Sequence, residues 1–152
     1  SRTSNKILVY TSIINHKGKL EVLKKFDEKF VIFGMYEDHT DDNLTFRSFS
    51  DSGFEKELLE CKAIITSGGI NLISEGLYLG KPLMILPIKN HFEQMLNALY
   101  IKENRYGEMC DELNEDNLKK FLNSLDKYKK INFKPGNQEL FKIVDEIIKE
   151  KK

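Results

Sequence analysis
A chain of 152 residues with 40% hydrophobic and 11% aromatic side chains is long enough for one domain with a hydrophobic core and too short for two ordinary domains. Its 24 basic and 24 acidic side chains cancel, so it lacks the concentrated positive charge that selects a nucleic acid or an anionic membrane surface. No apolar run approaches the roughly 20 residues of a membrane span and no signal-peptide pattern opens the chain, which predicts a cytoplasmic domain.

The first elements of the chain alternate between strand and helix patterns. Runs of β-branched and aromatic residues predict strands over 6–12 and 29–34. Between them, Leu20, Leu23 and Phe26 recur at helical spacing. This part of the chain therefore predicts a strand, helix, strand unit.

The next segment is acidic, and a strand and a helix follow it. We expect the acidic stretch 36–43 to be a solvated turn and residues 44–49 to form the third strand. Ser52 with Glu55 three residues later has the spacing of a capping box, which predicts a helix over 54–61.

Two continuous apolar runs follow, at 62–67 and 82–87, and both are predicted strands. Helices are predicted over 70–79 and 92–104, and 106–110 predicts a short edge strand. Gly80, followed by Pro82, is expected to end the first of these helices as a left-handed C-cap. Strands that are apolar throughout, rather than alternating, are typical of a parallel sheet with helices on both faces.

Two helices are predicted in the remainder of the chain. Asn114 is the expected N-cap of a helix that runs to about Leu125, and Leu113 and Leu118 on either side of it have the spacing of a hydrophobic staple. Farther on, Leu140 begins the apolar face of an amphipathic closing helix over 138–149.

This order of elements predicts a single α/β domain with a doubly wound, Rossmann-like parallel sheet. Sheets of this kind bind ligands at the carboxyl ends of their strands, so we expect function to lie in the loops that follow strands. The two cysteines, Cys61 and Cys110, have no CxxC or Cys/His spacing, so we expect buried thiols and neither a disulfide nor a zinc site.

One of those loops is a bare glycine turn between a strand and a helix. Ser67, Gly68 and Gly69 follow the strand over 62–67, and the helix begins near Ile70 or Asn71. A helix N-terminus has unpaired amides and about half a positive charge, and glycines leave room for an anion to approach. The turn is therefore suited to phosphate. Neither the P-loop lysine nor GxGxxG is present, which excludes those two kinds of nucleotide site.

Polar side chains lie near this turn in the predicted fold. Glu75 is about a turn and a half into the helix, where a carboxylate reaches a sugar hydroxyl attached to a bound phosphate. Glu93 and Gln94 begin the next helix. A carboxylate beside an amide accepts and donates hydrogen bonds, which suits adjacent hydroxyls of a sugar.

The segment "AIITSGGINLISEGLYLGKPLMILPIKNHFEQMLNALYI" resembles the donor-binding half of GT-B glycosyltransferases. It is especially similar to the nucleotide-diphospho-sugar enzymes that include the UDP-glycosyltransferases and the peptidoglycan N-acetylglucosaminyl transferase. Their pattern reads HGGxN, a glutamate in the following helix, GxP, a strand ending in proline, then DQ or EQ, and NA. The match is specific over 63–98, and the order of strands and helices agrees over nearly the whole chain.

The resemblance implies a role for each matching residue. The diphosphate would be held by the amides around Gly68, Gly69, Ile70 and Asn71. Glu75 would bind the ribose hydroxyls, and Glu93 with Gln94 would bind the transferred sugar.

Two further contacts are implied at other strand ends. The loop with Thr11 and Ser12 resembles a Gly-Ser phosphate contact, although the usual glycine is missing. The nucleobase would lie against residues 47–49, where Phe49 could stack on it.

The chain departs from the family pattern at two positions. Ser67 stands where many relatives have histidine, which replaces a charged phosphate contact with a hydroxyl, and Glu93 replaces the commoner aspartate. His91 could donate to the sugar or phosphate, but a histidine that caps the helix is an equally good interpretation. The acidic cluster at 37–42 is interpreted as a solvated loop, and we expect no metal, because in this family amides and a helix dipole stabilise the phosphates.

The resemblance implies a C-terminal nucleotide-sugar-binding domain over 1–152, half of a hexosyltransferase. The donor, UDP-linked by resemblance, is a substrate and no cofactor is expected. An inverting transfer of a hexose or N-acetylhexosamine would use catalytic residues in an N-terminal acceptor domain, and any peripheral membrane contact would be made by that half. Because the chain opens on Ser1, we expect it to be a piece of a longer protein, inactive alone. The alternatives are a stand-alone subunit with a partner acceptor half, a sugar-nucleotide epimerase half, and a non-catalytic nucleotide-sugar sensor.

Overall fold

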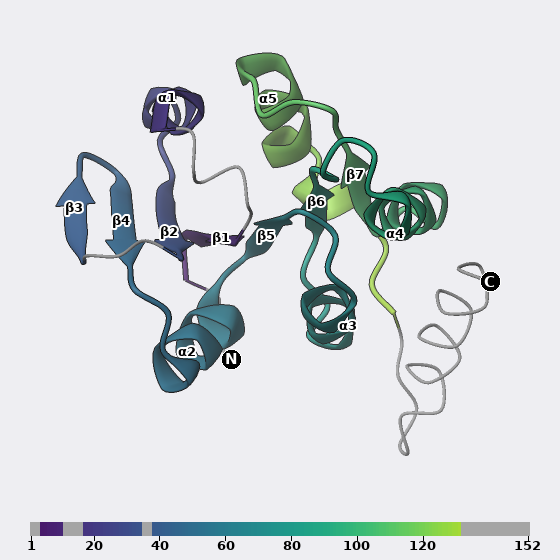
Figure 1. Ribbon diagram of the computed structural model, residues 1–152, viewed down its shortest axis with the longest axis horizontal. Coiled ribbons are helices and arrows are strands. Elements are labelled where there is room, and N and C mark those ends of the chain that lie inside the picture. The colour runs from purple at the N-terminus through teal and green to yellow at the C-terminus, as the bar shows by residue number, and fades with distance from the viewer. Residues whose placement is uncertain (1–3, 11–16, 35–37, 132–152) are drawn as a thin grey trace.

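A seven-stranded sheet runs through the centre of the computed structural model, which describes residues 4–10, 17–34 and 38–131 (Figure 1). Its spatial order is β3-β4-β2-β1-β5-β6-β7. All neighbouring strands pair parallel except β3 with β4. The strands are β1 Lys6–Tyr10, β2 Lys29–Phe33, β3 His39–Asp41, β4 Leu44–Arg47, β5 Ala63–Thr66, β6 Leu83–Ile85 and β7 Gly107–Met109.

Helices cover both faces of the sheet (Figure 1). One apolar cluster joins one face of the sheet to α1, η2 and α5, and a second joins the other face to α2, α3 and α4. The predicted doubly wound, Rossmann-like α/β fold is therefore confirmed. The helices are α1 Lys17–Leu20, η2 Glu21–Lys25, α2 Asp51–Glu60, α3 Ile70–Tyr78, α4 Phe92–Glu103, α5 Glu115–Asn123 and η3 Leu125–Lys127.

The strand order reverses between β1 and β5. From β1 the sheet grows through β2 and β4 toward one edge, and from β5 it grows through β6 and β7 toward the other. Neighbouring connections leave in opposite directions at such a point, which opens a crevice at the carboxyl ends of the two strands. In this chain those ends are Tyr10 and Thr66, which are also partners in the β1–β5 register.

The prediction of a solvated turn over the acidic stretch is wrong, because part of it forms strand β3. β3 and β4 make a hairpin in which Asp42 adopts a φ of 56°. The His39 ring stacks on Phe46 at 4.4 Å between centroids, and Asp41 pairs with Lys24 at 2.7 Å. Every residue of β3 is exposed, so the strand has no apolar pattern by which the sequence could reveal it.

Two helix predictions also differ from the structure. The helix expected around Leu20 and Leu23 is a single α-turn followed by the 3-10 turn η2. The Asn43 amide donates to the carbonyls of Leu23, Phe26 and Glu28. These carbonyls converge on one side chain, whereas the carbonyls of a continuing α-helix all point along its axis.

The capping box at Ser52 is wrong as well. α2 begins at Asp51 with Ser50 as its N-cap, and Ser50 has extended backbone angles and makes no side-chain capping bond. The boundary therefore lies before Ser52, which is inside the first turn and too late to cap it.

Other local predictions are confirmed. Gly80 follows α3 with a φ of 69° and bonds back to Leu77, as a left-handed helix terminator does. Asn114 caps α5 by accepting a hydrogen bond from the Asn117 amide at 2.8 Å. β7 is an edge strand of the sheet. The closing helix over 138–149, and Thr11 and Ser12, lie outside the described residues.

Candidate functional site

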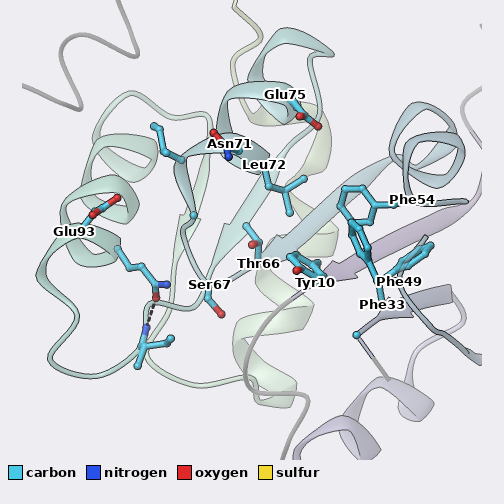
Figure 2. Close-up of a pocket in the computed structure, with 15 residues that line it drawn as sticks. Tyr10, Phe33, Phe49, Phe54, Thr66, Ser67, Asn71, Leu72, Glu75 and Glu93 are labelled. Atoms are coloured by element: carbon cyan, nitrogen blue, oxygen red, sulfur yellow. Dashed lines mark hydrogen bonds between the residues drawn. The ribbon is translucent and has the colours of Figure 1, made fainter. Parts of the chain in front are cut away.

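A cavity of about 790 Å³ opens at the carboxyl ends of the strands, across the point where the strand order reverses (Figure 2). Its walls come from the ends of β1, β2 and β5, from the starts of α3 and α4, and from Phe54 of α2. Strand ends and helix starts from separate parts of the chain therefore converge on one hollow. The strands and helices that form the walls of the cavity are held together by the apolar core.

The glycine turn forms the floor of this cavity. Gly68 has a φ of 107°, a conformation that glycine adopts without strain, and Gly69 is the N-cap of α3 with ordinary backbone angles. Gly69 makes no side-chain capping bond, and a Cβ built on it would meet no atom within 4 Å. The cavity therefore extends up to the start of α3, where the first amides carry the partial positive charge of the helix end.

Carboxylate and amide groups lie beside the turn. Glu75 is exposed on α3, and Glu93 with Gln94 begins α4; all three line the cavity. The Gln94 side-chain oxygen accepts a hydrogen bond from the Ile88 amide at 2.9 Å, drawn as the dashed line in Figure 2. With its oxygen engaged in its own loop, the Gln94 side chain is left with its NH2 group as the donor for a ligand.

Most of the predicted binding residues line this one cavity. They are Phe49, Ser67, Gly69, Ile70, Asn71, Glu75, Glu93 and Gln94. Gly68 is buried behind the lining, where its carbonyl bonds to α4. His91 is the N-cap of α4, and its Nδ1 accepts from the Gln94 amide at 3.2 Å. The capping interpretation of this histidine is therefore the one that its geometry matches.

An aromatic wall at the opposite end of the cavity was not predicted as a unit. Tyr10, Phe33, Phe49 and Phe54 lie together there (Figure 2). The Phe49 ring centre is 5.9 Å from that of Tyr10 and 5.3 Å from that of Phe54. Tyr10 and Phe33 end β1 and β2, so each reads in the sequence as a core strand residue. The signal that could have identified them is their place at the carboxyl end of a strand.

An ion-pair network lies behind the aromatic wall. Arg47 lies over the Phe33 ring at 5.9 Å from its centre and is 3.9 Å from the Glu57 carboxylate. Glu57 is buried and also pairs with Lys6 at 3.3 Å. The wall is therefore attached both to α2 and to the first strand. Gly34, Thr66, Leu72 and Ile88 complete the lining, and none of them was a predicted binding residue.

The described residues offer the cavity hydrogen-bonding groups and an apolar wall. Among residues 4–10, 17–34 and 38–131, no three histidine, cysteine or acidic side chains are grouped as metal ligands. Burial raises the pKa of both thiols to about 11, so Cys61 and Cys110 are poor nucleophiles. No helix within those ranges has the length and apolar character to cross a bilayer.

Comparison with known proteins identifies similar sequences and folds. The model of a family described as "Glycosyl transferase family 1" matches residues 1–126. The glycosyltransferase SnogD from Streptomyces nogalater superposes with a TM-score of 0.62 at 17% identity, covering 99% of this chain and 39% of that one. VinC, crystallised with dTDP, gives 0.63 at 16% identity and covers 99% and 38%.

A plant structure has the same architecture. UGT89C1 from Arabidopsis thaliana, complexed with UDP, gives a TM-score of 0.55 at 18% identity and covers 95% of this chain and 39% of that one. At these identities the likeness establishes the fold. The chain spans about two fifths of the length of the three structures. No curated protein matches it by sequence.

Proposed function
Since the chain belongs to glycosyl transferase family 1 and has the GT-B architecture that its sequence resembles, we propose that it is the donor-binding half of a glycosyltransferase. In this proposal the cavity holds a nucleoside diphosphate linked to a sugar. The single observation that carries the proposal is the start of α3, where glycine stands in place of a capping side chain and the helix end lines a cavity with an aromatic wall at one end and polar groups near the other.

The diphosphate is assigned to the floor of the cavity. Gly69, the N-cap of α3, has no side chain to offer the first amides of the helix, and no atom lies within 4 Å of where a Cβ on Gly69 would be. Unpaired amides and a helix dipole together stabilise an anion without a metal ion or a lysine. The Ser67 hydroxyl lies in the same lining.

The remaining parts of the donor are assigned to the walls. Glu75, exposed on α3, takes the ribose hydroxyls, and Glu93 with the Gln94 NH2 group takes the sugar. The base lies on the aromatic wall beside Phe49. Because the related VinC and UGT89C1 were crystallised with dTDP and UDP, we assign a pyrimidine base to the donor.

The transfer itself requires a second half that binds the acceptor. The chain spans about two fifths of the length of SnogD, VinC and UGT89C1, and in the family that it resembles a second domain binds the acceptor. We therefore assign residues 1–152 to a C-terminal domain, with the acceptor and the catalytic base supplied by another domain or subunit. An inverting displacement at the sugar is assigned by family resemblance.

Binding measurements on the 152-residue chain test the proposal. Calorimetric titrations with UDP, dTDP, GDP and inorganic pyrophosphate are expected to show weak binding, because the other half of the cleft is absent. Replacing Glu75 by alanine removes charge-assisted hydrogen bonds worth about 1.5–3 kcal/mol. UDP should then bind roughly 10- to 150-fold more weakly, whereas pyrophosphate should bind as before.

Gly69→Val tests the diphosphate assignment, as Glu75→Ala tests the ribose assignment. Gly69 has a φ of −66° and open space around its Cβ position, so we expect the fold to accept valine there. The new side chain would occupy the space assigned to phosphate, and both UDP and pyrophosphate should bind more weakly. No binding of any nucleotide at millimolar concentration would refute the donor site. Equal losses of UDP and pyrophosphate in Glu75→Ala would refute the ribose assignment alone.

A further inference from the structure
The glycine turn is held from below by one buried side chain of α4. The Asn97 side chain is fully buried, and its Nδ2 donates to the carbonyl of Gly68 at 2.8 Å, across 29 residues of sequence. We infer that Asn97 is a positioning residue: it fixes the orientation of the Gly68–Gly69 peptide and thereby aims the Gly69 amide at the bound diphosphate. This inference rests on the proposed function and adds a residue that does not itself line the cavity.

The orientation follows from the planarity of the peptide bond. In a trans peptide the carbonyl and the N–H of one unit point in opposite directions. The Gly68 carbonyl and the Gly69 N–H belong to the same unit. Since the carbonyl is directed at Asn97, in the buried interior, the Gly69 N–H is directed away from the interior, on the side where Gly69 lines the cavity.

A glycine pair alone would not hold this orientation. Gly68 occupies a φ of 107°, and glycine reaches several other backbone states at little cost. The turn is packed closely against α4, since a Cβ on Gly68 would lie 3.1 Å from the Gln94 carbonyl oxygen and 3.2 Å from Ile85. The packing requires glycine at this position, and the hydrogen bond from Asn97 adds a direct restraint on the orientation of that glycine's carbonyl.

The chemistry of Asn97 favours a role beyond stability. Its Oδ1 is buried without a protein partner among the described residues, and its neighbours in α4, Ala98 and Ile101, belong to the apolar core. A buried carboxamide with one half unsatisfied costs free energy that an apolar residue would not. A residue that served only the core would be better replaced by leucine, whereas a residue that orients a peptide needs its NH2 group.

Asn97 also links two parts of the proposed site. Gln94 and Asn97 are three residues apart in α4 and so lie on neighbouring positions of one helix face. Gln94 lines the part of the cavity that is assigned to the sugar. Asn97 donates a hydrogen bond to the glycine turn that is assigned to the diphosphate. The same helix face therefore sets the distance between the two subsites.

Variants of the 152-residue chain separate positioning from folding. Asn97→Ala is expected to weaken pyrophosphate and UDP binding at least tenfold, because the Gly69 amide is no longer held toward the anion. Uridine, which carries no phosphate, should bind as it does to the parent chain when titrated by NMR.

Asn104→Ala is the matched control for Asn97→Ala. Asn104 is the C-cap of the same helix, and its Nδ2 also donates to a backbone carbonyl, that of Tyr100, at 2.9 Å. It is exposed and lies outside the cavity lining. The control therefore removes the same kind of hydrogen bond at the other end of α4, and it should leave the affinities for pyrophosphate, UDP and uridine unchanged.

A second measurement requires no variant. On titrating the parent chain with pyrophosphate, the Gly69 amide proton should shift, and the Asn97 side-chain amide protons should exchange slowly both with and without ligand. Unchanged pyrophosphate affinity in Asn97→Ala, a parallel loss of uridine binding, or a Gly69 amide that does not respond to bound pyrophosphate would each overturn the inference while leaving the donor site standing. A parent chain that binds neither UDP nor pyrophosphate would overturn both.

Discussion
Phe49 offers a direct test of the aromatic wall, because it is the wall residue most open to a ligand. It follows β4, is 51% exposed, and lies 5.3 Å from the Phe54 ring and 5.9 Å from the Tyr10 ring. Phe33, in contrast, is fully buried. Phe49→Ala therefore removes a ring face that a base can reach without opening the core.

The magnitude follows from stacking and burial. Base stacking on an aromatic side chain is worth about 1–3 kcal/mol by alanine substitution, so UDP should bind roughly 5- to 150-fold more weakly. Truncating a fully buried phenylalanine to alanine costs about 3–5 kcal/mol. Because about half of Phe49 is exposed, its removal should lower the free energy of unfolding by about 2 kcal/mol at most.

Calorimetric titration with UDP and pyrophosphate, together with urea unfolding, measures both quantities. Pyrophosphate affinity should not change, since the ring is assigned to the base. Phe92→Ala is the control, because Phe92 is 67% exposed at the start of α4 and lies outside the cavity lining. The stacking assignment is refuted if UDP affinity falls equally in the two variants, or if pyrophosphate affinity falls as much as UDP affinity in Phe49→Ala.

Two further predictions concern the core. A Cβ on Gly107 would lie 1.7 Å from the carbonyl oxygen of Leu83, so Gly107→Ala forces β7 away from β6. At about 3 kcal/mol of overpacking, the melting temperature should fall by roughly 6–12 °C. A melting temperature within about 2 °C of the parent would contradict the contact. Burial raises the pKa of Cys61 and Cys110 to about 11, so roughly one thiol in a thousand is ionised at about pH 8. Alkylation by iodoacetamide should be slow and should accelerate about tenfold per pH unit up to about pH 10, with the half-buried Cys110 reacting before Cys61. Reaction of Cys61 at the rate of free cysteine would show that the thiol is not enclosed.

The sequence predicts those features that depend on short-range patterns. Continuous apolar runs identify β5 and β6 as buried parallel strands, and in the structure each lies between two parallel neighbours. Gly80 and Asn114 end and begin helices as their chemistry requires. The glycine turn and the glutamates of the site lie in loops and helices that follow these predicted strands. Because the carboxyl ends of parallel strands lie at the same edge of a sheet, a parallel sheet brings these residues to one cavity.

Features that depend on contacts between distant segments were not predicted. The order of strands in the sheet is set by pairing, and the sequence of one strand does not name its neighbour. β3 has no buried face, so its pairing with β4 leaves no pattern. Phe33 is buried like any core residue, and its place in the aromatic wall depends on where β2 ends. The hydrogen bond from Asn97 to Gly68 joins α4 to the turn between β5 and α3, which lies 29 residues earlier in the sequence.

The central claim is that a nucleoside diphosphate binds across the carboxyl ends of β1 and β5. Titrating ¹⁵N-labelled chain with UDP and following the backbone amides tests this most directly. The account predicts that the largest shifts fall on residues 67–72 at the start of α3, with smaller ones at Phe49 and Gln94, all around the cavity. Shifts confined instead to the separate groove lined by Lys102, Arg105 and Lys127, or no shifts at millimolar UDP, would contradict it.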